Sequence, residues 1–201
     1  MIKVIELFSG IGSQVEALKR AGIDHKVIAT SDIDVYANKT YRFLHGFVPN
    51  YGDISKVEEL PKADLWTYSF PCTDISLAGK MAGLQDGTRS GMLFQVERIL
   101  NELSSTNSLP QVLIMENVPT IHSETLGFAK DFVKWQLALE KLGYTNYWQD
   151  CDTREIGYPN PLPQSRVRTF MVSILGQYNY SFPQKQKLQL RLKDLLDNEV
   201  D

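Results

Sequence analysis

The amino-acid sequence predicts a doubly wound, Rossmann-like α/β domain. Short apolar segments with the length of buried strands alternate with amphipathic segments whose apolar residues recur at helical spacing. Such alternation is typical of a parallel sheet that helices cover on both faces. A glycine-rich turn also follows the first strand, at the place where folds of this class bind ligands.

The expected elements follow one another as far as residue 176. Strands are expected at 3–7, 25–31, 63–70, 111–118, 145–152 and 168–176, and helices at 13–22, 35–46, 92–103 and 127–143. In the first helix Val15 and Leu18 have helical spacing, and Gly22 is suited to end the helix. After residue 176 we expect a polar tail that contains one short helix.

The composition is that of a globular protein. Hydrophobic residues make up 43% and charged residues 22% of the 201 residues, and no apolar run reaches the roughly 18 residues of a membrane helix. The N-terminus lacks the pattern of a signal peptide, and two cysteines are too few for a disulfide framework or a cysteine zinc site, so we expect a cytoplasmic protein. The net charge of -3 counts against a simple nucleic-acid-binding module.

The first motif is LFSGIGS, at the end of the first strand. Gly10 and Gly12 allow the backbone to turn tightly and to approach a ligand, and the helix that begins at Ser13 presents free N–H groups. A dinucleotide fingerprint would have a third glycine where this sequence has Val15. The turn is therefore either a site for another ligand or an ordinary glycine-rich connection.

Acidic residues follow the next segments of the chain. Asp32 comes directly after the second strand, where a carboxylate can accept both hydroxyls of a ribose, whereas Asp34 is placed to cap the next helix. Asp53 is either a cap or an acceptor for the amino group of an adenine, with Ile33 and Ile54 as apolar faces for the ring. Together these signals favour a nucleoside cofactor without a 2′-phosphate.

The stretch TYSFPCTDIS places a thiol at the end of the third strand. Pro71 fixes its own φ and pushes Phe70 toward extended geometry, which holds Cys72 at the carboxyl end of that strand. The thiol of Cys72 is either a nucleophile or a small buried side chain. Cys151 has no comparable setting, and we expect a structural role for it.

Three further groups lie near strand ends. Glycines at 79, 83, 87 and 91 predict either a loop that closes over a substrate or an ordinary surface loop. Glu116, in MENVPT, is either a functional acid or part of a capping pair. Arg166 and Arg168 share one face of an extended segment, which suits an anionic or polar substrate or a solvated edge strand.

With these motifs in this order, the sequence resembles the C5-cytosine DNA methyltransferases, especially their bacterial and phage members. FSGIGS resembles the family's F-x-G-x-G-G, with Ser13 in place of the last glycine, and FPCTDIS is similar to the P-C nucleophile segment. ENV matches as it stands, and QSRVR matches Q-x-R-x-R. The resemblance extends from Met1 to about Gly176.

The resemblance implies the sheet of an S-adenosylmethionine-dependent methyltransferase, with the cofactor bound across the strand ends. Asp32 would hold the ribose, at a position where the family usually has Glu, and the adenine would lie beside Asp53. The residues implied to contact S-adenosylmethionine are Phe8, Gly10, Ile11, Gly12, Asp32, Ile33, Asp53, Ile54, Pro71 and Leu93.

The same resemblance assigns the chemistry to Cys72, Glu116, Arg166 and Arg168. Cys72 would add to C6 of cytosine and thereby raise the electron density at C5, which accepts the methyl group. Glu116 would hydrogen-bond the N3/N4 edge and supply a proton, Arg168 would bind O2, and Arg166 would support the base or the thiolate. Because C5 and C6 are inaccessible in duplex DNA, the target cytosine would be flipped out.

Members of the family continue with a target-recognition domain and an Asn-containing segment, and this sequence reaches Asp201 without them. We therefore expect residues 1–180 to form the catalytic and cofactor-binding domain and residues 181–201 to form a linker. The chain is then either one subunit of a split enzyme, whose second chain carries the recognition domain, or a truncated or degenerate product. Two alternatives stay open, a tRNA-directed relative and a non-catalytic S-adenosylmethionine-binding subunit. The presence of all four acting residues argues against the second.

Overall fold

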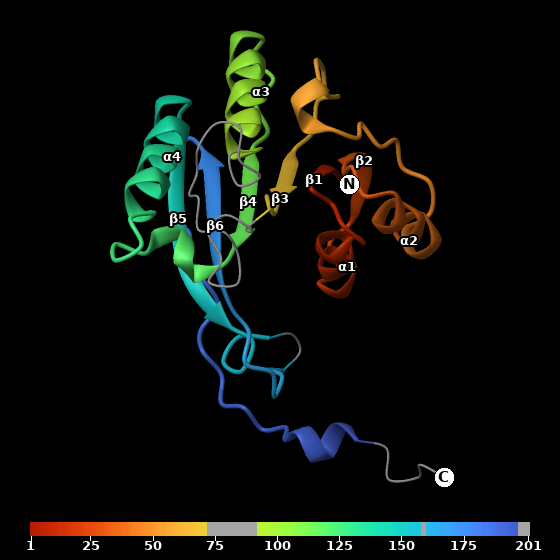
Figure 1. The fold of residues 1–201 in the computed structure, drawn as a ribbon, viewed down its shortest axis with the longest axis vertical. Coiled ribbons are helices and arrows are strands. Elements are labelled where there is room, and N and C mark those ends of the chain that lie inside the picture. The colour runs from red at the N-terminus through yellow and green to blue at the C-terminus, as the bar shows by residue number, and fades with distance from the viewer. Residues whose placement is uncertain (72–91, 158–159, 197–201) are drawn as a thin grey trace.

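The computed structural model describes residues 1–71, 92–157 and 160–196, and it contains a six-stranded sheet with the order β2-β1-β3-β4-β6-β5 (Figure 1). The strands are β1 Ile2–Leu7, β2 His25–Ser31, β3 Leu65–Tyr68, β4 Val112–Asn117, β5 Tyr144–Asp152 and β6 Val167–Leu175. The α-helices are α1 Ser13–Arg20, α2 Val35–His45, α3 Leu93–Ser105 and α4 Ala129–Lys141, and the 3-10 helices are η1 Ile54–Lys56, η3 Pro119–His122 and η4 Leu192–Leu195. The predicted α/β fold is confirmed, and the element ends differ from the expected ones by a few residues.

One part of the prediction, a wholly parallel sheet, is wrong. Strand β6 runs antiparallel to both of its neighbours, β4 and β5, whereas β2, β1, β3 and β4 are parallel. The connection from β5 to β6 contains no helix in its described residues, so it cannot make the crossover that a parallel strand needs. The sheet therefore ends in an antiparallel pair.

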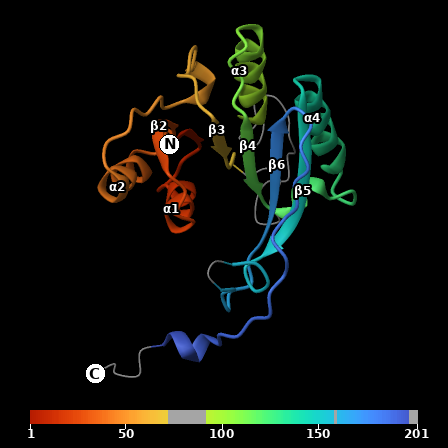
Figure 2. The ribbon, with the colours of Figure 1, turned by 180° about the vertical axis from the view of Figure 1, so that it is seen from behind.

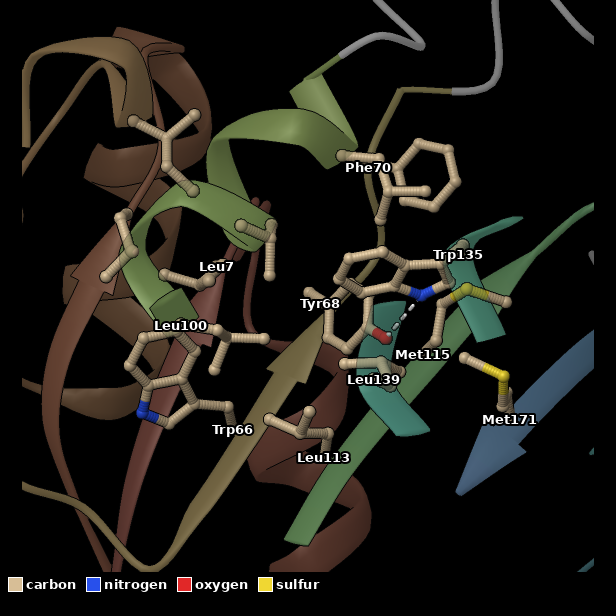
Figure 3. Packing of buried hydrophobic residues seen from close by; sticks show 14 of the residues in the cluster. Leu7, Trp66, Tyr68, Phe70, Leu100, Leu113, Met115, Trp135, Leu139 and Met171 are labelled. Atoms are coloured by element: carbon tan, nitrogen blue, oxygen red, sulfur yellow. Dashed lines mark hydrogen bonds between the residues drawn. The ribbon is translucent and has the colours of Figure 1, made fainter. Parts of the chain in front are cut away.

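The helices lie on opposite faces because the chain leaves the centre of the sheet in two directions. Right-handed crossovers place α1 on one face as the chain moves from β1 to β2, and α3 on the other face as it moves from β3 to β4. Under α3 and α4 lies the main core, with Leu7, Tyr68 and Met115 from the strands (Figure 3). The indole N–H of Trp135 in α4 donates to the Tyr68 hydroxyl at 3.2 Å.

On the face that carries α1 and α2, the fully buried Glu6 joins three elements. Its Oε1 accepts the backbone N–H of Val15 in α1 at 2.9 Å, and its Oε2 accepts the hydroxyl of Tyr41 in α2. Helix α1 follows Gly12, which has no side chain with which to cap it, so Glu6 supplies an acceptor for one of the free N–H groups. Burial raises the pKa of Glu6, against the opposing effect of these two hydrogen bonds.

Gly12 is required by the same packing. Its φ is +87°, and a Cβ at this position would lie 2.5 Å from the ring of His45 and 2.9 Å from that of Tyr41. A side chain at this position would therefore have to displace the rings of His45 and Tyr41, because such separations are well below ordinary contact distances, and the backbone conformation would also be strained.

After β6 the chain returns along the face of β5 and β6 (Figure 2). The Tyr147 hydroxyl donates to the carbonyl of Tyr178, and the rings of Tyr147 and Tyr180 are 5.8 Å apart. Lys185 then forms an ion pair with Glu155 at 2.5 Å. Contacts with the sheet region thus continue past residue 180, the expected end of the domain.

In the described part of the chain, no helix has the length and apolarity needed to cross a bilayer.

The buried carboxylate gives a pH-dependent prediction for stability. Because the pKa of Glu6 is raised by folding, its protonated form is favoured in the native state, so its contribution to the free energy of unfolding falls as pH rises through the raised pKa. Glu6→Gln should remove this slope. Glu6→Ala should cost about 2–5 kcal/mol, since the Val15 N–H and the Tyr41 hydroxyl lose their acceptor.

Urea unfolding of wild type and both variants between pH 4.5 and pH 8 measures these differences. The two variants share all other titrating groups with the wild type, so the difference in slope isolates Glu6. A Glu6→Gln protein with the wild-type slope would contradict the assignment.

Candidate functional site

Two cavities open at the carboxyl ends of the strands. The first cavity has a volume of about 600 Å³ and lies between the ends of β1, β2 and β3. Six of the ten residues expected to contact a cofactor line it, namely Phe8, Asp32, Ile33, Asp53, Ile54 and Pro71. This is where the strand order reverses direction, the usual ligand position in doubly wound sheets.

The second cavity has a volume of about 650 Å³ and lies over β4 and β6. Its floor includes Ile114 and Phe170, and its sides are the start of α1 and the returning segment with Tyr180. The expected residues that line it are Gly10, Ile11, Glu116, Arg166 and Arg168. Phe8 and Ser69 line both cavities, and we call these two residues the shared wall.

Phe8 holds its place in the shared wall at the cost of a strained backbone. Its φ is +56°, in the left-handed region that side chains other than glycine rarely adopt. Strain of this kind costs about 1–3 kcal/mol and is concentrated at ligand sites. The Phe8 N–H donates to the carbonyl of Ser31 at 2.6 Å, which ties the turn after β1 to the end of β2.

Asp32 organises the loops around the first cavity. Its Oδ2 accepts the N–H of Gly10 at 2.7 Å, and its Oδ1 accepts the N–H of Asp34 at 2.8 Å. The side-chain amide of Asn50 makes two hydrogen bonds with the backbone of Asp32. Its Oδ1 accepts the Asp32 N–H and its Nδ2 donates to the Asp32 carbonyl, each at 3.0 Å. A carboxylate has about four acceptor positions, so Asp32 keeps capacity for a ligand.

The other acids at this edge act as caps. Asp34 accepts the N–H groups of Tyr36 and Ala37 at the start of α2, as its capping interpretation predicts. Asp53 caps η1, where hydrogen bonds from the hydroxyl and the N–H of Ser55 lower the pKa of Asp53. Asp53 also lines the first cavity. For Asp53 the two interpretations drawn from the sequence are therefore compatible.

Two expected cofactor residues do not line either of these cavities. Gly12 faces α2, for the packing reason given above, and Leu93 is 2% exposed within the core. The residue before it, Met92, lines the first cavity instead. The phase of α3 against the sheet decides which of these two neighbouring side chains faces the cavity, and the sequence gives no signal for that phase.

Cys72 and the glycine-rich segment 79–91 lie outside the described residues. The backbone that leads to Cys72 is nevertheless held firmly. The amide nitrogen of Asn117, at the end of β4, donates to the carbonyl of the buried Phe70 at 3.2 Å, and its oxygen accepts the N–H of Val118 at 2.8 Å. The ends of β3 and β4 are thus joined one residue before Pro71.

Glu116 and Arg168 form an ion pair across β4 and β6, with Arg168 Nε 3.1 Å from Glu116 Oε1. Antiparallel pairing sets Glu116 opposite Phe170, so Arg168, two residues away, points to the same face. Both side chains are about three-quarters buried. Arg166 is exposed and lines the same cavity from the start of the strand.

Cys151 also lines the second cavity, which the sequence did not indicate. It is directly opposite Arg168 in the pairing of β5 with β6. Burial, together with the charge of Asp150, raises the pKa of the Cys151 thiol, so this cysteine is a poor nucleophile at neutral pH.

The chain matches the family model described as C-5 cytosine-specific DNA methylase over residues 2–201. It is 32% identical to the type II methyltransferase M2.ScrFI of Lactococcus lactis subsp. cremoris, with all of this chain and 69% of that protein covered. It is 31% identical to the type II methyltransferase M.HhaI of Haemophilus parahaemolyticus, with all of this chain and 59% of that protein covered. The chain thus spans about half to two thirds of the length of such relatives.

Among solved structures, the fold is similar to that of the Dnmt2 methyltransferase of S. pombe, with a TM-score of 0.74 and 23% identity over all of this chain and 61% of that one. The motifs, the two cavities and the match over residues 2–201 agree. The chain belongs to the C5-cytosine-specific DNA methylase family.

Proposed function

We propose that this chain is the catalytic and cofactor-binding part of an enzyme that methylates C5 of cytosine in DNA. The methyl donor of C5-cytosine DNA methyltransferases is S-adenosylmethionine. The observation that carries the proposal is the pair of adjoining cavities, one with Asp32 and Asp53 and one with the Glu116–Arg168 pair, separated by the shared wall.

The first cavity suits the nucleoside part of the cofactor. Asp32 retains acceptor positions for the two ribose hydroxyls, because its two recorded hydrogen bonds use only part of the carboxylate. Ile33, which is 74% exposed, and the buried Ile54 offer apolar contact for the adenine ring. The bound cofactor supplies an electrophilic methyl group, and these residues bind and orient it.

The second cavity suits the cytosine. Cys72 follows the fixed Phe70–Pro71 strand end and is the proposed nucleophile, whose thiolate adds to C6 and makes C5 electron-rich. Glu116, as the protonated acid, hydrogen-bonds the N3/N4 edge and gives its proton to N3, which offsets the negative charge on the ring and leaves the carboxylate paired with Arg168. After methylation at C5, removal of the C5 proton allows the bond between Cys72 and C6 to break.

The Glu116–Arg168 ion pair prepares both groups for this role. The Arg168 guanidinium holds the Glu116 carboxylate in one orientation at 3.1 Å. An arriving cytosine offers hydrogen-bonding groups to Glu116 at N3 and N4, while its O2 is an acceptor for the remaining N–H groups of Arg168. Arg166, at the exposed rim, is placed to support the base or the thiolate.

We further propose that a second chain supplies recognition of duplex DNA, with the target cytosine flipped into the second cavity. This chain carries a net charge of -3, whereas phosphate neutralisation by basic residues provides most non-specific DNA affinity. We also propose that residues 1–180 form the catalytic domain and that residues 181–201 form a linker whose first residues remain in contact with that domain, in a protein that we place in the cytoplasm.

Cys72→Ala should abolish methyl transfer while leaving cofactor binding nearly unchanged. With the recognition part present, wild type should form a stable adduct with DNA that contains 5-fluorocytosine, because fluorine prevents loss of the C5 substituent. Denaturing electrophoresis detects the adduct. The matched control is Cys151→Ala, which should still form it. An adduct that survives Cys72→Ala or disappears in Cys151→Ala would refute the assignment.

Asp32→Ala should weaken S-adenosylmethionine binding by about 1–3 kcal/mol, because the ribose hydroxyls lose their acceptor. Calorimetry on the folded variant measures the change. Asp32→Asn, which keeps one carbonyl oxygen for the loop N–H groups, separates ligand binding from loop structure and should show an intermediate loss. Unchanged affinity in both variants would mean that Asp32 only shapes the turns after β1 and β2.

The 201-residue chain alone should show little or no methylation of duplex DNA. Addition of a chain with the recognition domain and the Asn-containing segment should give sequence-specific methylation and tighter cofactor binding. Transfer of a tritiated methyl group to DNA, with tRNA as a parallel substrate, measures both effects. Strong sequence-specific methylation by residues 1–201 alone would contradict the need for a second chain.

A further inference from the structure

Ser69 is one of the two residues of the shared wall, which lies between the first cavity and the second cavity. It is the first residue after β3, and it lines both cavities together with Phe8. A ligand with its nucleoside in the first cavity must pass these two side chains to reach the second. Since Gly10 and Ile11 line only the second cavity, a cofactor that contacts both them and Asp32 extends past Ser69.

A chain of hydrogen bonds holds the Ser69 hydroxyl in position. The Ser13 hydroxyl donates to Oε1 of Gln14 at 3.1 Å, and Nε2 of Gln14 donates to Oγ of Ser69 at 3.1 Å. In this arrangement the Ser69 oxygen acts as an acceptor, and its own proton finds no acceptor among the described residues. Ser69 therefore presents a free, oriented donor at the junction of the two cavities.

A second donor without a partner is found at the same place. Ser9 also lines the second cavity, is only 3% exposed, and has an Oγ without any hydrogen-bond partner within the described ranges. A buried hydroxyl in this state costs free energy unless a ligand satisfies it. The N–H groups of Ser13 and Gln14, the first two of α1, likewise have no acceptor in the described part of the chain, whereas the third is bonded to Glu6.

These groups are all hydrogen-bond donors, and α1 adds the positive end of its dipole. Such a set binds an anionic acceptor, and S-adenosylmethionine has one, the α-carboxylate of its amino-acid end. We propose that Ser69, oriented by Gln14, donates a hydrogen bond to this carboxylate and so positions the methyl donor between the two cavities. The inference rests on the proposed function, because it assumes that S-adenosylmethionine occupies the first cavity.

The test compares two ligands that share a nucleoside. S-adenosylhomocysteine has the amino-acid end, and 5′-methylthioadenosine lacks it. In Ser69→Ala, the dissociation constant for S-adenosylhomocysteine should rise about fivefold to tenfold, the usual effect of one lost hydrogen bond to a charged group, while that for 5′-methylthioadenosine stays unchanged. Calorimetry on the 201-residue chain measures both constants.

Three further variants sharpen the comparison. Gln14→Glu brings a negative charge beside the carboxylate and should weaken S-adenosylhomocysteine more than tenfold without affecting 5′-methylthioadenosine, even if Ser69→Ala folds poorly. Ser69→Thr keeps the hydroxyl and should restore most of the affinity. Asp32→Ala is the control for the nucleoside end and should weaken both ligands.

The outcomes separate this inference from the proposed function. If the wild-type chain binds both ligands but Ser69→Ala and Gln14→Glu leave the ratio of the two constants unchanged, the role of Ser69 is refuted and the cofactor site stands. If the wild-type chain binds neither ligand, the proposed cofactor site itself fails, and the role of Ser69 fails with it.

Discussion

The hydrogen bonds of the buried Glu6 carboxylate fix the geometry on which the site depends. Helix α1 begins at Ser13, directly after Gly12, where a Cβ would collide with the rings of His45 and Tyr41 in α2, and glycine offers no side chain to cap the helix. Glu6, at the end of β1, provides the missing acceptor for Val15 and is itself held by Tyr41. The two residues therefore depend on each other, and together they set the path of the turn between β1 and α1.

That turn determines how the two cavities meet. Both ends of the turn are fixed, and within it the backbone of Phe8 has a left-handed conformation and donates a hydrogen bond to the carbonyl of Ser31. Phe8 and Ser69 then line both the cavity with Asp32 and the cavity with the Glu116–Arg168 pair. The two cavities thus adjoin at Phe8 and Ser69, so ligands bound in both would lie next to each other, as direct group transfer requires.

The sheet also explains where the second cavity lies. Helices α3 and α4 cover one face, and the core beneath them is closely packed. On the other face α1 and α2 lie over β1 and β2, and the returning segment lies along β5 through Tyr147 and Tyr180. Between them β4 and β6 are left open, and the side chains that point outward there include Glu116 and Arg168. The proposed active site therefore lies at the part of the sheet that no described helix covers.

The sequence by itself determined the order and type of the elements, because helical and strand periodicity are local. It also determined that acids such as Asp32 and Glu116 lie at the ends of strands that share one edge of the sheet. Only the tertiary structure decided what depends on contacts between distant segments. The phase of α3 buries Leu93 and turns Met92 to the cavity, and the register of β5 against β6 brings Cys151 opposite an arginine of the site. Helix phase and strand register are set by packing across the whole sheet, so no short stretch of sequence encodes them.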